Sequence, residues 1–122
     1  MALHESGEMY LETIHMLSAK LNAVRAIDIV KEMGFSKPSV SRAMTNLREE
    51  NYIIVDDRGF ISLTDTGLEV ALKICERHNV LTEYLTAIGV PEDIAAEDAC
   101  KMEHVISDET FNAIKTHLNK VD

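Results

Sequence analysis

Three side chains that bind transition metals are grouped near the C-terminal end of the sequence. The segment EDACKMEHVISDE, residues 97–109, contains Cys100, Glu103 and His104 at spacings of three and four residues. On an α-helix these positions fall within an arc of about 100°. A thiol, a carboxylate and an imidazole on one face indicate a metal site, a catalytic cluster or a coincidence, and the remaining residues decide among these.

Three further candidate ligands lie far from this segment in the sequence. His78 falls at the edge of an apolar stripe in a long predicted helix, and Met9 and Glu12 are three residues apart in the first predicted helix. Thioether, thiolate, imidazole and carboxylate donors together suit first-row divalent transition metals better than calcium or magnesium. Each residue also has a structural interpretation, because single methionines and histidines on helices usually pack or face solvent. His4, close to Met9, has no cluster of its own and is interpreted as a surface residue.

The apolar periodicity predicts three helices in the first part of the chain. The first is expected over residues 3–20, and a short second helix over residues 25–34 is expected to end at Gly34. Ser36 is the predicted N-cap of the third helix, with Pro38 in its first turn. The short connection between the second and third helices predicts a tight helix-turn-helix arrangement.

A change of period after the third helix predicts a β-hairpin. The segment YIIVDDRGFISLT consists of two strand-like runs, with Asp57 and Gly59 near the turn between them. Helix, turn, helix and hairpin follow one another in the order of a winged helix-turn-helix. The predicted fold class is therefore mainly α, with an N-terminal winged helix-turn-helix DNA-binding domain over residues 1–64.

Residues 65–122 are predicted to form a helical metal-binding and dimerisation domain. Thr64 or Asp65 is expected to cap a long helix that ends at Gly89, and the last of two shorter helices is capped by Ser107. The long helix is apolar on two opposite sides, and a helix of this kind must bury both. In so short a chain this pattern predicts a homodimer.

The third helix has the two faces that a DNA-reading helix requires. Val40, Met44 and Leu47 fall within an arc of about 60° and are expected to face the core. The opposite face is short, polar and partly basic, although any solvent-facing helix is polar. Arg42 can donate two hydrogen bonds to a guanine edge, and Arg58 is at the hairpin tip. The candidate DNA-contacting residues are Ser36, Lys37, Pro38, Ser39, Ser41, Arg42, Asn46 and Arg58.

The charge distribution permits DNA as a partner despite a net charge of −9. Residues 20–48 contain six basic and two acidic residues, a local balance of +4, so the other 93 residues carry −13. A cationic segment in an acidic protein is consistent with double-stranded DNA on one face. It is equally consistent with cations bound among the carboxylates elsewhere.

The sequence has no feature that directs it to a membrane or out of the cell. It contains no apolar run of membrane-spanning length, and its N-terminus has no basic segment followed by an apolar core. Its two cysteines are not needed as a disulfide in a helical domain and are expected to be reduced. We expect a cytoplasmic protein with no membrane partner.

Three stretches together resemble one known family over essentially the whole chain. They are EMYLETIHML, FSKPSVSRAMTNLREENYI, and the pair ERHNVLTEYL and DACKMEHVISDE. The chain thus resembles the DtxR/MntR family of metal-dependent transcriptional repressors. The resemblance implies a repressor that binds an operator as a homodimer when loaded with metal. It also implies a two-domain form without the SH3-like third domain of the iron-responsive branch.

The resemblance also implies a set of metal ligands. The residues that match the primary site of the iron-responsive branch are Met9, Cys100, Glu103 and His104. Glu12 and His78 match ligands of the two-metal cluster in the manganese-responsive branch, and Ala96 stands where the iron branch has an ancillary histidine. The manganese branch carries Asp and Glu at positions 9 and 100, so the softer donors here favour Fe²⁺. Mn²⁺, Co²⁺, Ni²⁺ and Zn²⁺ also fit the donors in vitro.

Alternative functions remain consistent with the same residues. A manganese-responsive repressor of this family is the first, and a winged-helix regulator that senses oxidation through Cys100 is the second. A metallohydrolase is the third, because three ligands and an open position can activate water. The sequence has no separate general base and no loop long enough to hold a substrate. We therefore expect a non-enzyme without a small-molecule substrate.

Overall fold

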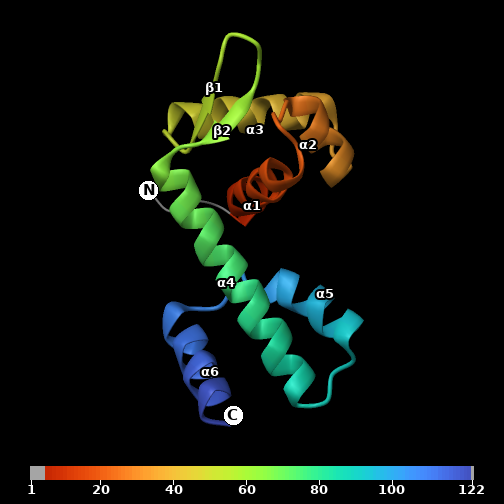
Figure 1. The fold of residues 1–122 in the computed structure, drawn as a ribbon, viewed down its shortest axis with the longest axis vertical. Coiled ribbons are helices and arrows are strands. Elements are labelled where there is room, and N and C mark those ends of the chain that lie inside the picture. Colours follow the sequence, from red (N-terminus) through yellow and green to blue (C-terminus); the bar gives the residue numbers. More distant parts are fainter. Residues whose placement is uncertain (1–4, 122) are drawn as a thin grey trace. The chain divides into compact units, whose positions relative to one another are not determined.

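The computed structural model describes residues 5–121, which form six helices and two short strands in the predicted order (Figure 1). The described residues pack as two compact units, divided between Leu72 and Lys73. The division falls within helix α4 (Asp65–Ala87), which continues from one unit into the other. The predicted fold class, a winged helix-turn-helix followed by a helical region, is confirmed. Among the described residues no helix is long and apolar enough to cross a membrane.

Helices α1 (Glu5–Lys20), α2 (Ala26–Met33) and α3 (Lys37–Glu49) form the base of the N-terminal unit. The predicted start of the first helix at residues 3 and 4, including His4, lies outside the described residues. Gly34 ends α2 in the left-handed conformation, with φ of 73°, and its N–H donates to the Val30 carbonyl at 2.9 Å. Ser36 Oγ accepts the N–H of Ser39 at 3.3 Å, which confirms the predicted N-cap of α3.

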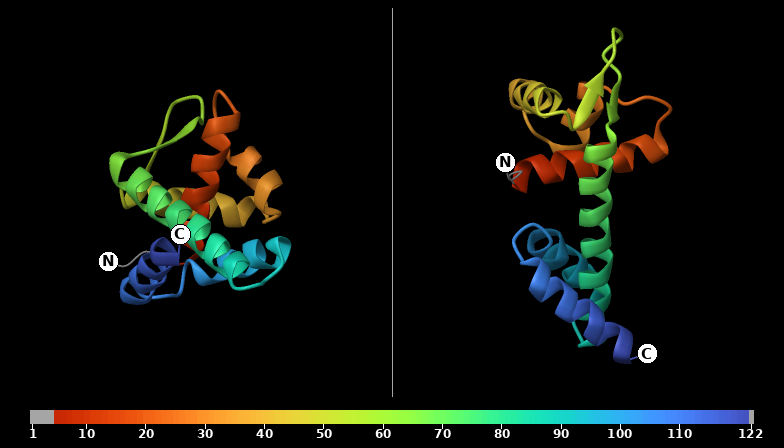
Figure 2. Two further views of the ribbon diagram at one scale, coloured as in Figure 1. Left: turned by 60° about the horizontal axis from the view of Figure 1, so that its bottom comes forward. Right: turned by 90° about the vertical axis from the view of Figure 1, so that its left-hand side faces the viewer.

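The wing is a two-stranded antiparallel hairpin of β1 (Ile53–Val55) and β2 (Ile61–Leu63). Figure 2 shows its loop extending away from α3. Asp57 lies in the turn, as predicted, and Asp56 organises the loop, because its Oδ1 accepts the N–H groups of Arg58 and Phe60, each at 2.9 Å. Gly59 adopts a φ of 82°, which an L-residue rarely adopts.

The core of the N-terminal unit joins its three helices to the wing. Val40, Met44 and Leu47 of α3 are buried, as predicted from their spacing. They belong to one apolar cluster whose fully buried members include Leu11, Ile14, Ile29 and Val40. The Ile61 N–H donates to the Val24 carbonyl at 2.7 Å, which ties β2 to the segment before α2. The wing is thus attached by both packing and hydrogen bonds.

The start of α4 is fixed by contacts with the two residues before β1. Thr64 Oγ1 accepts the Gly67 N–H at 3.1 Å, so Thr64 rather than Asp65 caps the helix. The Thr64 N–H donates to the Tyr52 carbonyl at 3.0 Å, and the Thr64 hydroxyl donates to the Asn51 carbonyl at 2.7 Å, with a longer contact of 3.1 Å to the Tyr52 carbonyl. These bonds connect the wing to the helix that leaves the unit.

The C-terminal unit consists of the second half of α4 with α5 (Glu92–Met102) and α6 (Asp108–Val121) (Figure 1). Its buried apolar residues come from all three helices and are Ile74, Leu81, Ala95, Ala99, Phe111 and Leu118. Ser107 Oγ accepts the Thr110 N–H at 3.1 Å and caps α6, as predicted. Leu72 of α4 and Ile88, directly after the end of this helix, remain exposed in the single chain. This exposure leaves apolar surface for a partner.

Candidate functional site

The C-terminal unit brings three of the predicted metal ligands together. Nδ1 of His78 lies 3.0 Å from Oε2 of Glu103, and Nε2 of His104 lies 3.3 Å from Oε1 of the same carboxylate. The Glu103 side chain is 0% exposed and that of His104 is 1% exposed, whereas His78 is 33% exposed. A buried carboxylate is costly unless polar partners surround it. Here two imidazoles, from different parts of the sequence, approach its two oxygens.

The prediction that one helix carries Cys100, Glu103 and His104 is wrong for His104. Helix α5 ends at Met102, Glu103 is its C-cap and His104 lies in the following turn. Cys100 is exposed on the last turn of the helix. In this turn the Met102 carbonyl accepts the N–H groups of Val105 and Ile106, at 3.1 and 3.2 Å, and the carbonyls of Glu103 and Ile106 accept hydrogen bonds from α4. Local turn bonds and tertiary bonds therefore together set the positions of Glu103 and His104.

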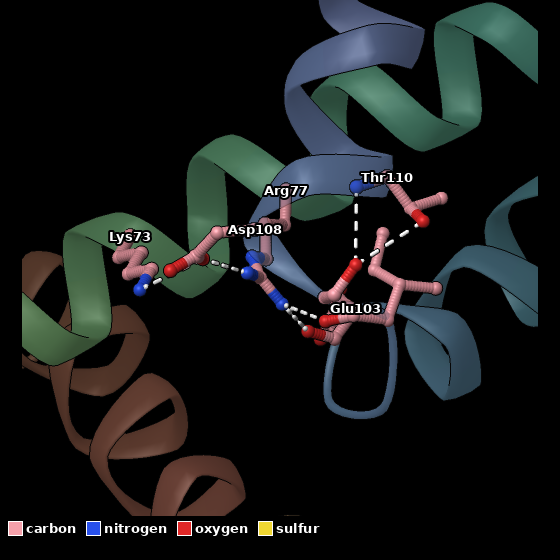
Figure 3. A network of polar contacts seen from close by, with 7 residues as sticks. Lys73, Arg77, Glu103, Asp108 and Thr110 are labelled. Atoms are coloured by element: carbon pink, nitrogen blue, oxygen red, sulfur yellow. Dashed lines mark hydrogen bonds and ion pairs between the residues drawn. The ribbon is translucent and has the colours of Figure 1, made fainter.

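Arg77 is the residue that makes these tertiary bonds (Figure 3). Its Nη1 donates to the carbonyls of Glu103 and Ile106 at 3.0 and 2.9 Å, and its Nη2 donates to the Asp108 carboxylate. Lys73 Nζ lies 3.1 Å from Oδ1 of Asp108. The hydrogen bond and charge of Lys73, and then those of Arg77, lower the pKa of Asp108. Nothing in the sequence singles out Arg77, apart from its position next to His78.

The donors of this cluster fit a divalent transition metal. Two imidazoles and one carboxylate are a donor set common to Mn²⁺, Fe²⁺ and Zn²⁺. Among the described residues of this unit, Glu103 and His104 have ligand atoms within 4.8 Å of each other, whereas His78 and His104 approach opposite oxygens of the carboxylate and do not converge on one point. A buried carboxylate with polar neighbours can also be a purely structural feature. The donor chemistry therefore supports a metal but does not identify it.

The other predicted ligands are distributed over both units. Met9 and Glu12 lie one helical turn apart on α1 in the N-terminal unit, and both are partly buried. Residues at this spacing lie on the same face of a helix. Cys100 belongs to the C-terminal unit. The assignment of Met9, Glu12 and Cys100 as ligands stays a prediction.

The predicted DNA-contacting face is the solvent-facing side of α3 and the wing loop. Its residues are exposed, except for Ser39, which is partly buried. The Ser36 hydroxyl caps α3 and also donates to Ser39 Oγ at 2.8 Å, so both serine side chains are occupied within the chain. Within the described part of the chain, the side chains of Lys37, Arg42 and Arg58 make no hydrogen bond of the kind that occupies the two serines. Their side chains are exposed to a partner.

Two family descriptions match nearly the entire chain. Residues 2–59 match "Iron dependent repressor, N-terminal DNA binding domain", and residues 64–122 match "Iron dependent repressor, metal binding and dimerisation domain". The transcriptional regulator MntR of Escherichia coli O6:H1 is 32% identical over 112 residues, which are 91% of this chain and 72% of MntR. An uncharacterized HTH-type transcriptional regulator of Methanocaldococcus jannaschii is 29% identical over 97% of this chain and 96% of its own length.

Solved structures show the same fold. The manganese regulator SloR has a TM-score of 0.81 and 26% identity, covering 98% of this chain. A manganese-dependent transcriptional repressor in complex with manganese has a TM-score of 0.80 and 26% identity, covering 93% of this chain. The chain spans 55% of the solved SloR chain and 52% of the second.

Proposed function

The chain belongs to the iron-dependent repressor family, and we propose on this basis that it is a metal-dependent transcriptional repressor that binds operator DNA as a homodimer when loaded with metal. The observation that carries the proposal is the buried pair Glu103 and His104, contacted by the partly exposed His78, within the segment that matches a metal-binding and dimerisation domain. The exposed apolar residues of α4 support a dimer. The proposed location is the cytoplasm.

We propose that the ion takes ligands from both units. The proposed ligands are Met9, Glu12, His78, Cys100, Glu103 and His104. An ion bound in this way restricts the orientation of the DNA-binding unit relative to the dimerising unit. In a two-fold dimer that orientation sets the distance between the two copies of α3, which must match one DNA turn of about 34 Å. Metal then shifts the population toward dimers with the correct spacing.

Fe²⁺ is the proposed physiological ion, and Mn²⁺ is the alternative. The thioether of Met9 and the thiol of Cys100 are softer donors than carboxylates and favour Fe²⁺. The names of the solved relatives, manganese regulator SloR and a manganese-dependent repressor, support the alternative. Because a thiol and imidazoles must be deprotonated to bind, affinity for either ion should decrease at low pH.

For the DNA-binding unit, we propose that α3 enters the major groove and that the wing contacts the flanking backbone. The proposed DNA contacts are Ser36, Lys37, Pro38, Ser39, Ser41, Arg42, Asn46 and Arg58. Their exposure supports this role, as does the cationic balance of residues 20–48.

The decisive experiment is an anaerobic DNA-binding titration under reducing conditions with Fe²⁺, Mn²⁺ and Zn²⁺ in turn. Operator fragments selected from random duplex DNA by the metal-loaded protein serve as the probe. We expect metal to strengthen binding and His104→Ala to abolish this dependence while leaving the helical content by circular dichroism intact. Metal-independent binding by wild type and His104→Ala at equal strength would contradict the proposal. Tight binding by reduced, metal-free protein would favour the thiol-sensing alternative.

A further inference from the structure

Arg77 is a buried cation whose donors converge on the turn that carries two proposed ligands. Its side chain is 8% exposed, and a buried guanidinium is stable only where its N–H groups find acceptors. Nη1 donates to the carbonyls of Glu103 and Ile106, at 3.0 and 2.9 Å. These two carbonyls lie on either side of His104 in the sequence. The guanidinium therefore holds the backbone of the segment that presents both side chains (Figure 3).

Two consecutive residues of α4 act on Glu103 in different ways. Arg77 holds its main-chain carbonyl, and His78 contacts its carboxylate through Nδ1 at 3.0 Å. The bond to Arg77 fixes the main chain of Glu103, and the contact with the imidazole fixes its carboxylate. His78 and Glu103 are 25 residues apart, and neither this spacing nor local helix propensity would bring the two side chains together.

The same guanidinium also fixes the far side of the turn. Nη2 donates to Asp108 in the first turn of α6, and the guanidinium carbon lies 5.4 Å from the centre of the Phe111 ring. Lys73 Nζ lies 3.1 Å from the Asp108 carboxylate but, within residues 5–121, makes no hydrogen bond to the turn itself. Lys73 and Arg77 are thus two cations on one carboxylate, of which only Arg77 also binds the backbone around His104.

We propose that Arg77 is a positioning residue for the metal. It sets the Glu103 carboxylate and the His104 imidazole in place before the ion arrives, and it raises affinity without being a ligand. Ligands already held in their bound geometry lose less conformational freedom when the ion binds, which is why outer partners of metal ligands affect affinity strongly. This inference rests on the proposed function, because it assumes that Glu103 and His104 bind an ion.

The test compares Arg77→Met with Lys73→Met, which removes the other cation on Asp108. Mn²⁺ binding is measured from the electron paramagnetic resonance signal of the free ion, and Co²⁺ binding from its visible absorption. Arg77→Met is expected to lower the affinity for both ions by about 10- to 100-fold, the usual effect of removing an outer partner of a metal ligand. Lys73→Met is expected to stay within about threefold of wild type, because its ion pair is largely exposed.

The absorption spectrum separates positioning from general stability. At saturating Co²⁺ the spectrum of Arg77→Met is expected to differ from that of wild type, because the ligands sit differently around the ion. A loss of stability alone would leave the spectrum of the folded, saturated protein unchanged. If Arg77→Met does not fold, Arg77→Lys is the deciding variant. Its ammonium group lacks the planar guanidinium that bonds two carbonyls and a carboxylate. The metal affinity of Arg77→Lys is expected to be reduced by roughly tenfold.

Three results would overturn the inference: wild-type affinity in Arg77→Met or Arg77→Lys, an equal loss in Lys73→Met, or an unchanged Co²⁺ spectrum in Arg77→Met. Failure of the proposed function has a different signature. In that case the wild-type chain itself binds neither Mn²⁺ nor Co²⁺.

Discussion

Gly67→Ala is expected to destabilise the N-terminal unit, although alanine is the better helix former. Gly67 lies in the first turn of α4, where local propensity alone would favour alanine by about 1 kcal/mol. A Cβ atom at this position would lie 2.1 Å from the Tyr52 carbonyl oxygen, whereas real contacts essentially never fall below 3.0 Å. The obstacle is backbone, so no side-chain rotation relieves it.

The size of the effect follows from what the Tyr52 carbonyl already does. It accepts the Thr64 N–H at 3.0 Å, and moving it by the missing 0.9 Å breaks or weakens this bond, whereas the Thr64 hydroxyl keeps its shorter bond to the Asn51 carbonyl. Such a bond contributes about 1 kcal/mol, and overpacking of this kind costs about 1–3 kcal/mol. After the helix-propensity gain is subtracted, we expect a net loss of about 2 kcal/mol.

Urea denaturation followed by circular dichroism measures this loss directly as a change in the free energy of unfolding. Thr66→Ala is the matched control, because its side chain is exposed in the same helical turn, and its effect is expected within about 0.5 kcal/mol. An unfolding free energy of Gly67→Ala equal to or above that of wild type would refute the reasoning.

Three further substitutions test other parts of the molecule. Arg42→Ala should weaken operator binding by about 1–3 kcal/mol in a mobility-shift titration without changing metal uptake, and equal affinity would count against the groove assignment. Cys100→Ser should lower Fe²⁺ affinity more than Mn²⁺ affinity in competitive titrations; an unchanged ratio would exclude the thiol as a ligand. Asp108→Asn should lower the melting temperature near neutral pH, and the difference from wild type should vanish under acid. The pKa of Asp108 is lowered in the folded state, so its stabilisation is present above the unfolded pKa of about 3.9 and is lost as the pH falls through the folded value. A difference that persists in acid would show that charge is not the cause.

Local signals in the sequence predicted most of the secondary structure correctly. Gly34, Ser36 and Ser107 begin or end helices as expected, because caps bond to backbone groups only a few residues away. The inward-facing residues of α3 were equally predictable, since helical periodicity alone decides which side of a helix is apolar. The end of α5 was not predictable in this way. Residues 103–106 could continue a helix, whereas in the structure they form a turn that combines local bonds to the Met102 carbonyl with bonds from α4.

By itself, the sequence determined the types of donor, the winged helix-turn-helix and the family, because these depend on residue identity and short-range spacing. Tertiary structure alone decided that His78 meets Glu103, that Arg77 holds the turn around His104, and that Gly67 has no room for a side chain. The partners in these contacts are between 15 and 29 residues apart. No periodicity encodes such contacts, which exist only where packing of the folded chain brings the groups within bonding distance.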